Sequence, residues 1–529
     1  MKKFLIIFCF ALSILYSQEE NKSQSIELPD FVITGKESIT LPKIQKSSPD
    51  FIPLLSKDFF TPEYPNEDQT KVDLPKVETE VLNIGNYSQT THALLRFSAG
   101  LETWPLGEFF YNDWSGNFSY NAHLFGKNEL EYVDKAGLSL AGADIGAKYF
   151  VDHSSDFLPG LEIGFNGNYF YESFNFYGSA TPKINRITNN GFAGLDFNYV
   201  SDPFTNFGIN FSNSYYQQKD DEIDENIFGT NAYFKLRISD FDFKIEGNFK
   251  NQTISALNQN FGNQYYYSSM ATLGFKLYDI LNLKGGIYLS ESEGNTFFAP
   301  VAYGSLKFNK SISLYGEFAP NTEFKTLRDF RNLNRYYQLN NFVNLFIENK
   351  FNLKAAAKFE YEKYFEISGG VGYINSDNNF YFEDNLQNGF FTIHPEDIEK
   401  SYAFINLLFR KGPFGQFYGE IKLQNVSGQN DKYLPYSSTL ESQMNYSYDF
   451  IGGFGLKLGL LYFGEAYTNY DNTEKIPQSL DFNLSMYYEL FRNFNLTLAF
   501  ENLLNDKYYY FRNYEAKPFD VLAGFEFRW

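Results

Sequence analysis

The chain lacks the residues from which most catalytic and metal sites are built. Cys9 is its only cysteine, and the four histidines, His92, His123, His153 and His394, stand far apart in the sequence. No disulfide, thiolate metal site or histidine pair can therefore be drawn from the sequence. There is also no G-x-S-x-G elbow and no phosphate-binding P-loop. We therefore predict no catalytic residues, no metal and no cofactor, and we predict that the protein is not an enzyme.

Long hydrophobic runs and excess positive charge are also missing. After residue 16 no apolar stretch reaches the length of a membrane-spanning helix, so a helical membrane protein is not expected. The net charge of −20 argues against nucleic-acid binding, which favours basic surfaces. Aromatic residues nevertheless make up 20% of the chain, although the mean hydropathy is only −0.38. Many aromatics in a polar chain fit a barrel wall that is apolar outside and polar inside, with a soluble all-β protein as the alternative.

The first ninety residues differ from the rest. Met1-Lys2-Lys3, a largely apolar stretch Phe4–Tyr16 and a polar boundary predict a secretory signal peptide over residues 1–17. Residues 18–91 are poor in glycine and rich in proline, which removes a backbone donor and is excluded from central strands. We predict an extended or partly disordered periplasmic segment there rather than a packed domain. Its prolines are Pro29, Pro42, Pro49, Pro53, Pro62, Pro65 and Pro75.

Residues 92–529 alternate between apolar and polar side chains. In one example, Phe241, Phe243 and Ile245 interleave with Asp242, Lys244 and Glu246. Such half-apolar strands, joined alternately by short turns and long polar loops, predict a transmembrane antiparallel outer-membrane β-barrel of about 22 strands. The long loops are expected at Gln217–Asn226, Pro320–Phe351, Asn375–Lys400, Asn425–Ser437, Gly464–Gln478 and Asn505–Pro518.

The last strand is rich in aromatic residues. Phe525, Phe527 and Trp529 fall on one side of an extended chain and Glu526 and Arg528 on the other, because successive side chains of a strand point to opposite faces. An aromatic strand at the carboxyl terminus is typical of bacterial outer-membrane barrels. We predict that Phe525, Phe527 and Trp529 face lipid, close the wall against the first strand and serve recognition by the barrel assembly machinery. The expected location is the outer membrane of a Gram-negative cell.

Two local patterns have simple structural interpretations. The acidic run Asp220-Asp221-Glu222, followed by Asp224 and Glu225, lacks the glycine and terminal glutamate of a calcium loop, so solvated loop charge is expected. The runs Tyr265–Tyr267 and Tyr508–Tyr510 are expected in an aromatic girdle at the membrane interface, and stacking on a sugar or aromatic ligand is the alternative.

The last hairpins resemble those of the TonB-dependent transporters. The stretch Glu501–Tyr509, E-N-L-L-N-D-K-Y-Y, is similar to the E-N-L-F-[ND]-x-x-Y-Y stretch that precedes their last loop. Tyr462–Tyr467 is similar to their Y-x-G-x-x-Y segment. The specific sequence match covers about residues 435–529. The rest of the chain matches the family in the spacing of its strands only. The chain departs from the family because residues 18–91 are too few for a plug domain of ordinary length. The resemblance therefore implies a reduced or missing plug, with residues 18–91 as a short periplasmic or lumenal substitute.

The resemblance also implies a partner and a function. Asp30, Phe31, Val32, Ile33, Thr34 and Gly35 resemble the short box through which TonB adds a strand to its own sheet edge. An ordinary extended segment is the alternative there. The implied function is uptake or passage of a ligand across the outer membrane, with the ligand and its binding residues unknown. Alternatives are a passive diffusion channel, and a barrel that anchors a surface or periplasmic partner protein. The alternative to TonB as a partner is a plug or other partner protein on a separate chain.

Overall fold

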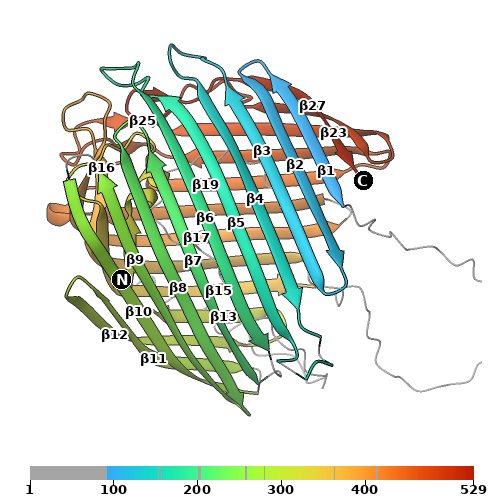
Figure 1. Cartoon of the computed structure of the whole chain (residues 1–529), viewed down its shortest axis with the longest axis vertical. Helices are drawn as coiled ribbons and strands as arrows, with labels where there is room; N and C mark the ends of the chain where they lie inside the picture. The colour runs from blue at the N-terminus through green and yellow to red at the C-terminus, as the bar shows by residue number, and fades with distance from the viewer. Residues whose placement is uncertain are drawn as a thin grey trace, which may run out of the picture.

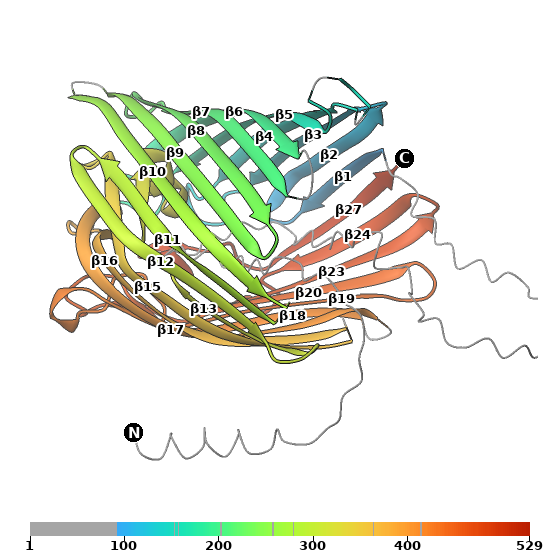
Figure 2. The same cartoon turned by 90° about the horizontal axis from the view of Figure 1, so that it is seen from below.

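The computed structural model describes residues 92–529, apart from residues 153, 157, 201–203, 257–258, 279, 363 and 413–414. The predicted signal peptide and the predicted segment 18–91 therefore lie outside the described residues. Within them the chain forms one antiparallel sheet closed into a barrel (Figures 1 and 2). None of the described helices is long and apolar enough to cross a membrane.

The sheet contains 23 named strands. Because β13 and β14 pair with consecutive halves of β15, they share one position, and the barrel has 22 wall strands, which confirms the predicted count. In chain order the wall strands are β1 Ala93–Gly100, β2 Thr103–Ser115, β3 Phe118–Glu129, β4 Leu138–Phe150, β5 Leu161–Asn175, β6 Asn185–Val200, β7 Thr205–Gln218, β8 Ile223–Ile238, β9 Phe241–Ala256, β10 Gln259–Leu277, β11 Leu281–Ser292, β12 Asn295–Lys307, β13 Ile312–Phe318, β14 Asn321–Thr326, β15 Asn344–Tyr361, β16 Phe365–Glu383, β17 Thr392–Gly412, β18 Gly415–Ser427, β19 Leu440–Asp449, β20 Phe454–Phe463, β23 Ser479–Phe491, β24 Phe494–Glu501 and β27 Asp520–Arg528.

The smaller elements all lie in connections between wall strands. The helix α2 Leu327–Leu333 follows β14, and the 3-10 helix η2 Gln429–Asp431 follows β18. The short hairpin strands are β21 Ala466–Tyr467 with β22 Lys475–Ile476, and β25 Tyr509–Phe511 with β26 Tyr514–Glu515.

The first and last strands close the barrel. β1 pairs with β27 in antiparallel register, with Leu95 opposite Phe527 and Phe97 opposite Phe525 (Figure 2). The backbone N–H of Trp529 donates to the carbonyl of Ala93 at 3.0 Å. Closure gives the first and the last strand a second neighbour with which to satisfy their backbone groups, as a lipid environment demands.

The outer face of the wall is apolar and the inner face is charged. On β9, Phe241 (50% exposed) and Ile245 (44%) point outward. The alternate residues of the same strand face inward. Asp242 forms an ion pair with Arg237 of β8 at 2.8 Å, and Lys244 forms one with Glu246 at 2.6 Å. A continuous apolar outer surface is stable only against lipid, and the alternation predicted from the sequence is confirmed. The fold is that of a membrane-spanning β-barrel.

Several predicted loops are shorter than expected, because the wall strands continue past the sequence positions where polar residues become frequent. Residues Gln217–Asn226 were predicted to be a long loop, and this is wrong: β7 runs to Gln218, β8 starts at Ile223, and Asn226 pairs with Tyr215. Within the predicted loop Asn375–Lys400, only residues 384–391 lie between β16 and β17. Paired strands satisfy their own backbone groups, so these hairpins need no apolar outer face where they leave the membrane.

Candidate functional site

The long connections at one end of the barrel pack together into a shared hydrophobic core, here called the loop core. It combines side chains from the connections 176–184, 327–343, 384–391, 428–439 and 502–519 with the nearest wall residues. These connections start from wall positions as far apart as β5, β14 and β24. Since their strands are distributed around the barrel, the loops can meet only by extending over the lumen.

The central contacts of the loop core are aromatic. The ring of Tyr336 stacks on that of Tyr514 with centroids 3.5 Å apart, and Tyr177 meets Tyr514 edge-on at 5.1 Å. Phe391 packs against Phe511 at 5.2 Å. The hydroxyl of Tyr514 donates to the carbonyl of Gly389 at 2.6 Å. Aromatic side chains bury large areas and favour such edge-on and offset contacts, so they fix these loops against one another.

Residues 327–343, here called the crossing segment, form the most buried of these connections. The segment opens with α2, where Thr326 and Asp329 form the capping contact: the Thr326 N–H donates to the Asp329 carboxylate at 3.0 Å. Leu327 and Phe330 of the helix are completely buried in the loop core. α2 is the coiled yellow ribbon inside the wall in Figure 2.

Glu225 of β8 holds the start of α2. Its carboxylate accepts the backbone N–H groups of Leu327 and Arg328, each at 3.0 Å, and the side-chain amide of Gln252 from β9 at 2.5 Å. The first N–H groups of a helix have no partner within the helix, and a carboxylate there is favourable for both hydrogen bonding and the helix dipole. Because β8 is separated from β14 by other wall strands, Glu225 ties the crossing segment to a distant part of the wall.

Other wall residues hold the rest of the crossing segment. The Gln252 side-chain amide also donates to the carbonyl of Val343 at 3.1 Å, and Asn340 donates to the carbonyl of Ile393 at 2.8 Å. Arg335 pairs with Glu172 of β5 at 3.4 Å. The segment is thus attached at its beginning, middle and end to strands β5, β8, β9 and β17.

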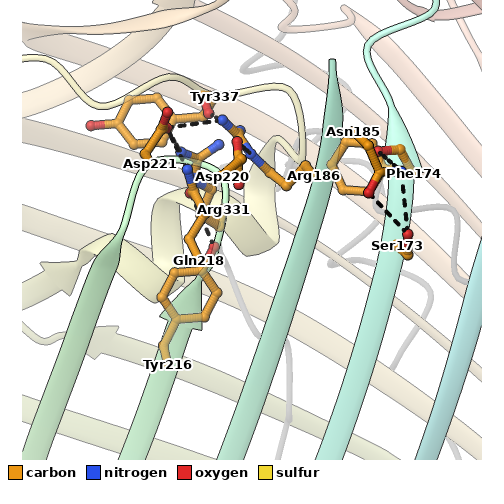
Figure 3. A network of polar contacts seen from close by, with 10 residues as sticks. All are labelled: Ser173, Phe174, Asn185, Arg186, Tyr216, Gln218, Asp220, Asp221, Arg331 and Tyr337. Atoms are coloured by element: carbon orange, nitrogen blue, oxygen red, sulfur yellow. Dashed lines mark hydrogen bonds and ion pairs between the residues drawn. The ribbon is translucent and has the colours of Figure 1, made fainter. Parts of the chain in front are cut away.

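A buried network of arginines and aspartates lies beside α2 (Figure 3). Arg186 of β6 pairs with Asp220 at 2.9 Å and Asp221 at 3.2 Å, and donates to the carbonyl of Tyr337 at 2.6 Å. Burial raises the pKa of Asp220, and the charge of Arg186 opposes that shift. Arg331 of α2 lies 3.9 Å from Asp221, although none of its side-chain nitrogens has a hydrogen-bond partner among the described residues. The network ties the β7–β8 turn to the crossing segment.

This network corrects the interpretation of the acidic run as solvated loop charge. Asp220 and Asp221 bind buried arginines, and Glu225 is 1% exposed. Their partners, Arg186 and the α2 backbone, are distant in the sequence, so the acidic run by itself could not predict these contacts. The girdle interpretation of Tyr508–Tyr510 is also wrong, because Tyr508 is buried and Tyr510 packs against the loop core. Tyr265 and Tyr267 are exposed on β10, whereas Tyr266 is buried.

A cavity of about 210 Å³ lies on the inner wall next to α2. Leu333 of α2 and Phe380 border it on the side of the crossing segment, and polar residues of β13–β17 line the wall. These are Glu317, Asn321, Glu323, Lys325, Asn349, Asn352, Lys354, Ser376, Asn379 and Lys400, with Ile347, Ile374 and Ile398 between them. It is a polar pocket beside the aromatic loop core. Most of its polar residues fall within the predicted loops Pro320–Phe351 and Asn375–Lys400, so the sequence assigned them no place on the inner wall.

The predicted site residues have different outcomes. Phe525, Phe527 and Trp529 lie on or next to β27, where Phe527 and Trp529 are exposed on the wall and Phe525 packs against Phe494 and Phe97. Their role in assembly stays a prediction. The predicted TonB-contact residues Asp30–Gly35 lie outside the described residues. Among the residues with described positions, no group of three histidine, cysteine, aspartate or glutamate side chains gathers to hold a metal.

Comparisons with known proteins identify the fold. No family model matches the sequence, and no curated protein matches it either. Solved structures do match. The siderophore receptor PiuA from Acinetobacter baumannii aligns with a TM-score of 0.64 at 10% identity, over 83% of this chain and 81% of that chain. This barrel has the fold of the TonB-dependent receptors.

Other receptors of this fold align equally well. The FrpB iron transporter from Neisseria meningitidis (F3-3 variant) aligns with a TM-score of 0.65 at 10% identity, over 83% of this chain and 81% of that chain. The copper transporter OprC aligns with a TM-score of 0.63 at 10% identity, over 83% and 80% of the two chains. At identities this low, the structural alignments establish the barrel fold of the TonB-dependent receptors, as the resemblance of the last hairpins predicted. They do not identify the ligand of this chain.

Proposed function

We propose that this protein takes up a ligand across the outer membrane, and that the loop core restricts entry to its barrel. The observation that carries the proposal is the loop core itself, built on a barrel with the fold of known outer-membrane transporters. A barrel of 22 strands encloses a wide lumen, and an open lumen would leak small molecules. A barrel that served only as an anchor would have no need of aromatic loops packed over its mouth.

We further propose that TonB supplies the energy and acts on the N-terminal segment. In this proposal residues 18–91 occupy the lumen or its periplasmic mouth, and Asp30–Gly35 add a strand to the sheet edge of TonB. A pull on that short box would draw the segment out of the lumen and open the periplasmic side. The support is the family resemblance of the box and the family fold of the barrel.

Single-channel conductance tests this proposal. The purified protein is measured with and without residues 18–91, and each form carries either the native residues 328–342 or a flexible Gly-Ser replacement of the same length. We expect low conductance for the intact protein and the highest conductance when both barriers are altered. In cells that carry the Gly-Ser replacement of residues 328–342, removal of residues 18–91 should also increase sensitivity to large antibiotics.

The outcomes separate the alternatives. A high conductance for the intact protein would mean a passive diffusion channel. Conductance that is unchanged on removal of residues 18–91, both with the native residues 328–342 and with their Gly-Ser replacement, would show that the segment does not fill the lumen. That result would also refute the proposal that TonB opens the barrel by pulling the segment out. In every variant, different migration of boiled and unboiled samples on a denaturing gel confirms that the barrel has folded.

A further inference from the structure

Two glycines on β16 lie close to Lys354, one of the residues that line the cavity beside α2. Gly372 lies opposite Lys354 of β15 on one side and opposite Tyr402 of β17 on the other. A Cβ at Gly372 would lie 2.1 Å from the Tyr402 ring, and one at Gly370 would lie 2.8 Å from the Phe404 ring. The missing side chains therefore let both rings lie across β16 toward β15. The ammonium group of Lys354 sits 5.3 Å from the Phe404 ring centroid.

Lys354 is a buried cation without a carboxylate partner. It is 9% exposed, and among the residues that the structure describes no carboxylate oxygen lies within the 4.0 Å of an ion pair. Lys358, on the same inner face of β15, differs from Lys354 in having carboxylate partners. It pairs with Glu366 at 3.0 Å and with Glu360 at 3.3 Å. Buried charges in proteins are normally paired, because removing an ion from water without a compensating partner is strongly unfavourable.

The carboxylates of the cavity are engaged elsewhere. Glu323 pairs with Lys325 at 2.7 Å and accepts the side-chain amide of Asn349 at 3.3 Å. Glu317 accepts the hydroxyl of Tyr315. It stands directly opposite Lys354 in the register of β13 and β15, but the two side chains form no ion pair. The second buried lysine of the cavity, Lys400, is 2% exposed. The charge of Lys400 acts on Glu441 of β19. The pocket thus brings two buried ammonium groups to one wall, and Lys354 is the one with no carboxylate within ion-pair distance among the described residues.

Neutral hydrogen-bonding groups surround the two lysines. Asn349, Ser376, Asn352 and Asn379 line the same cavity, and the Ser376 hydroxyl donates to the side chain of Asn349. The side-chain amide of Asn349 already donates to Asn321 and Glu323. An anionic oxygen group that entered the cavity would therefore meet the ammonium donors on one side and the side-chain amides of Asn352 and Asn379 around them. Charge-assisted hydrogen bonds of this kind are about twice as strong as neutral ones.

We propose that this cavity binds the anionic group, carboxylate or phosphate, of a small polar solute, with Lys354 as its principal cation. The inference rests on the proposed uptake function and assigns the chemical class of its ligand. The anion completes the missing ion pair of Lys354, and the isoleucines and Phe380 contact the rest of the molecule. The position of the cavity against α2 places the bound solute directly beside the crossing segment.

Isothermal titration calorimetry on the purified full-length protein in detergent tests the proposal. The probes are glucuronate, glucose 6-phosphate and glucose, which share a ring and differ in carrying a carboxylate, a phosphate or no charge. We expect at least one anion to bind roughly tenfold or more tightly than glucose, as one charge-assisted contact implies. The anion that binds better identifies the source of the charge.

Matched variants locate the site. Lys354→Gln is expected to abolish the preference for the anion, and Lys354→Arg to keep it, while Lys358→Gln, on the same face of the same strand, should change binding less than about twofold. Equal binding of glucose and both anions, no binding of either anion, or equal effects of Lys354→Gln and Lys358→Gln would each overturn the proposal. The titration needs neither TonB nor an open pore, so such a failure would leave the uptake proposal to be decided by conductance.

Discussion

The attachment of α2 to the wall by Glu225 makes a quantitative prediction. In Glu225→Gln, the new side chain keeps one acceptor oxygen but turns an NH₂ group toward the N–H donors of Leu327 and Arg328. One charge-assisted hydrogen bond is lost and one buried donor is left unsatisfied, at a cost of about 2–4 kcal/mol. The barrel wall does not depend on this contact, so we expect the loss to appear as local opening of the crossing segment rather than as unfolding.

Hydrogen exchange measures that opening directly. A loss of this size should speed exchange of the Leu327 and Arg328 amides by about 30-fold to 1000-fold, since each 1.4 kcal/mol is a factor of ten. The matched control is Glu222→Gln, an exposed glutamate at the neighbouring turn, which should leave these amides within about threefold of the unaltered protein. Exchange that is equally slow in both variants would refute the role of Glu225.

Three further predictions test the wall, the terminus and the buried network. Ile245→Arg, on the outer face of β9, should cost about 2–4 kcal/mol near the membrane midplane, and Asn248→Arg on the inner face much less; equal losses in urea titrations of barrel stability would mean the facing is reversed. Deletion of Phe527–Trp529 removes the pairing of Leu95 with Phe527 and the backbone bonds of Trp529 to Ala93, and should cause degradation or periplasmic aggregation, which membrane fractionation detects; normal outer-membrane levels would contradict this. Arg331→Met should leave thermal stability unchanged or raise it by about 1 kcal/mol, because its guanidinium nitrogens lack hydrogen-bond partners among the described residues; a clear loss in a melting experiment would show that its charge stabilises Asp221.

The alternation of residues determined most of the wall from the sequence. A period of two assigns each side chain to one face, so the exposure of Phe241 and Ile245 and the inward direction of Lys244 followed without any knowledge of partners. The same reasoning gave the strand number and the place of Phe525 and Phe527 beside β1. These features are local: each depends on residues close together in the chain and on the difference between lipid and water.

Only the tertiary structure decided the loop core and the cavity. Glu225 meets Leu327, and Lys354 lies near Phe404, because a closed barrel brings wall positions together that the sequence separates widely. A polar run such as Gln217–Asn226 predicts a solvated loop when its partners are unknown. Arg186, on the neighbouring strand β6, and the backbone of α2 supply those partners. Periodicity states which face a residue occupies, and barrel closure determines what stands opposite it there. The charge on Lys354 was therefore visible in the sequence, whereas the absence of a carboxylate partner for it within the described wall appeared only in the fold.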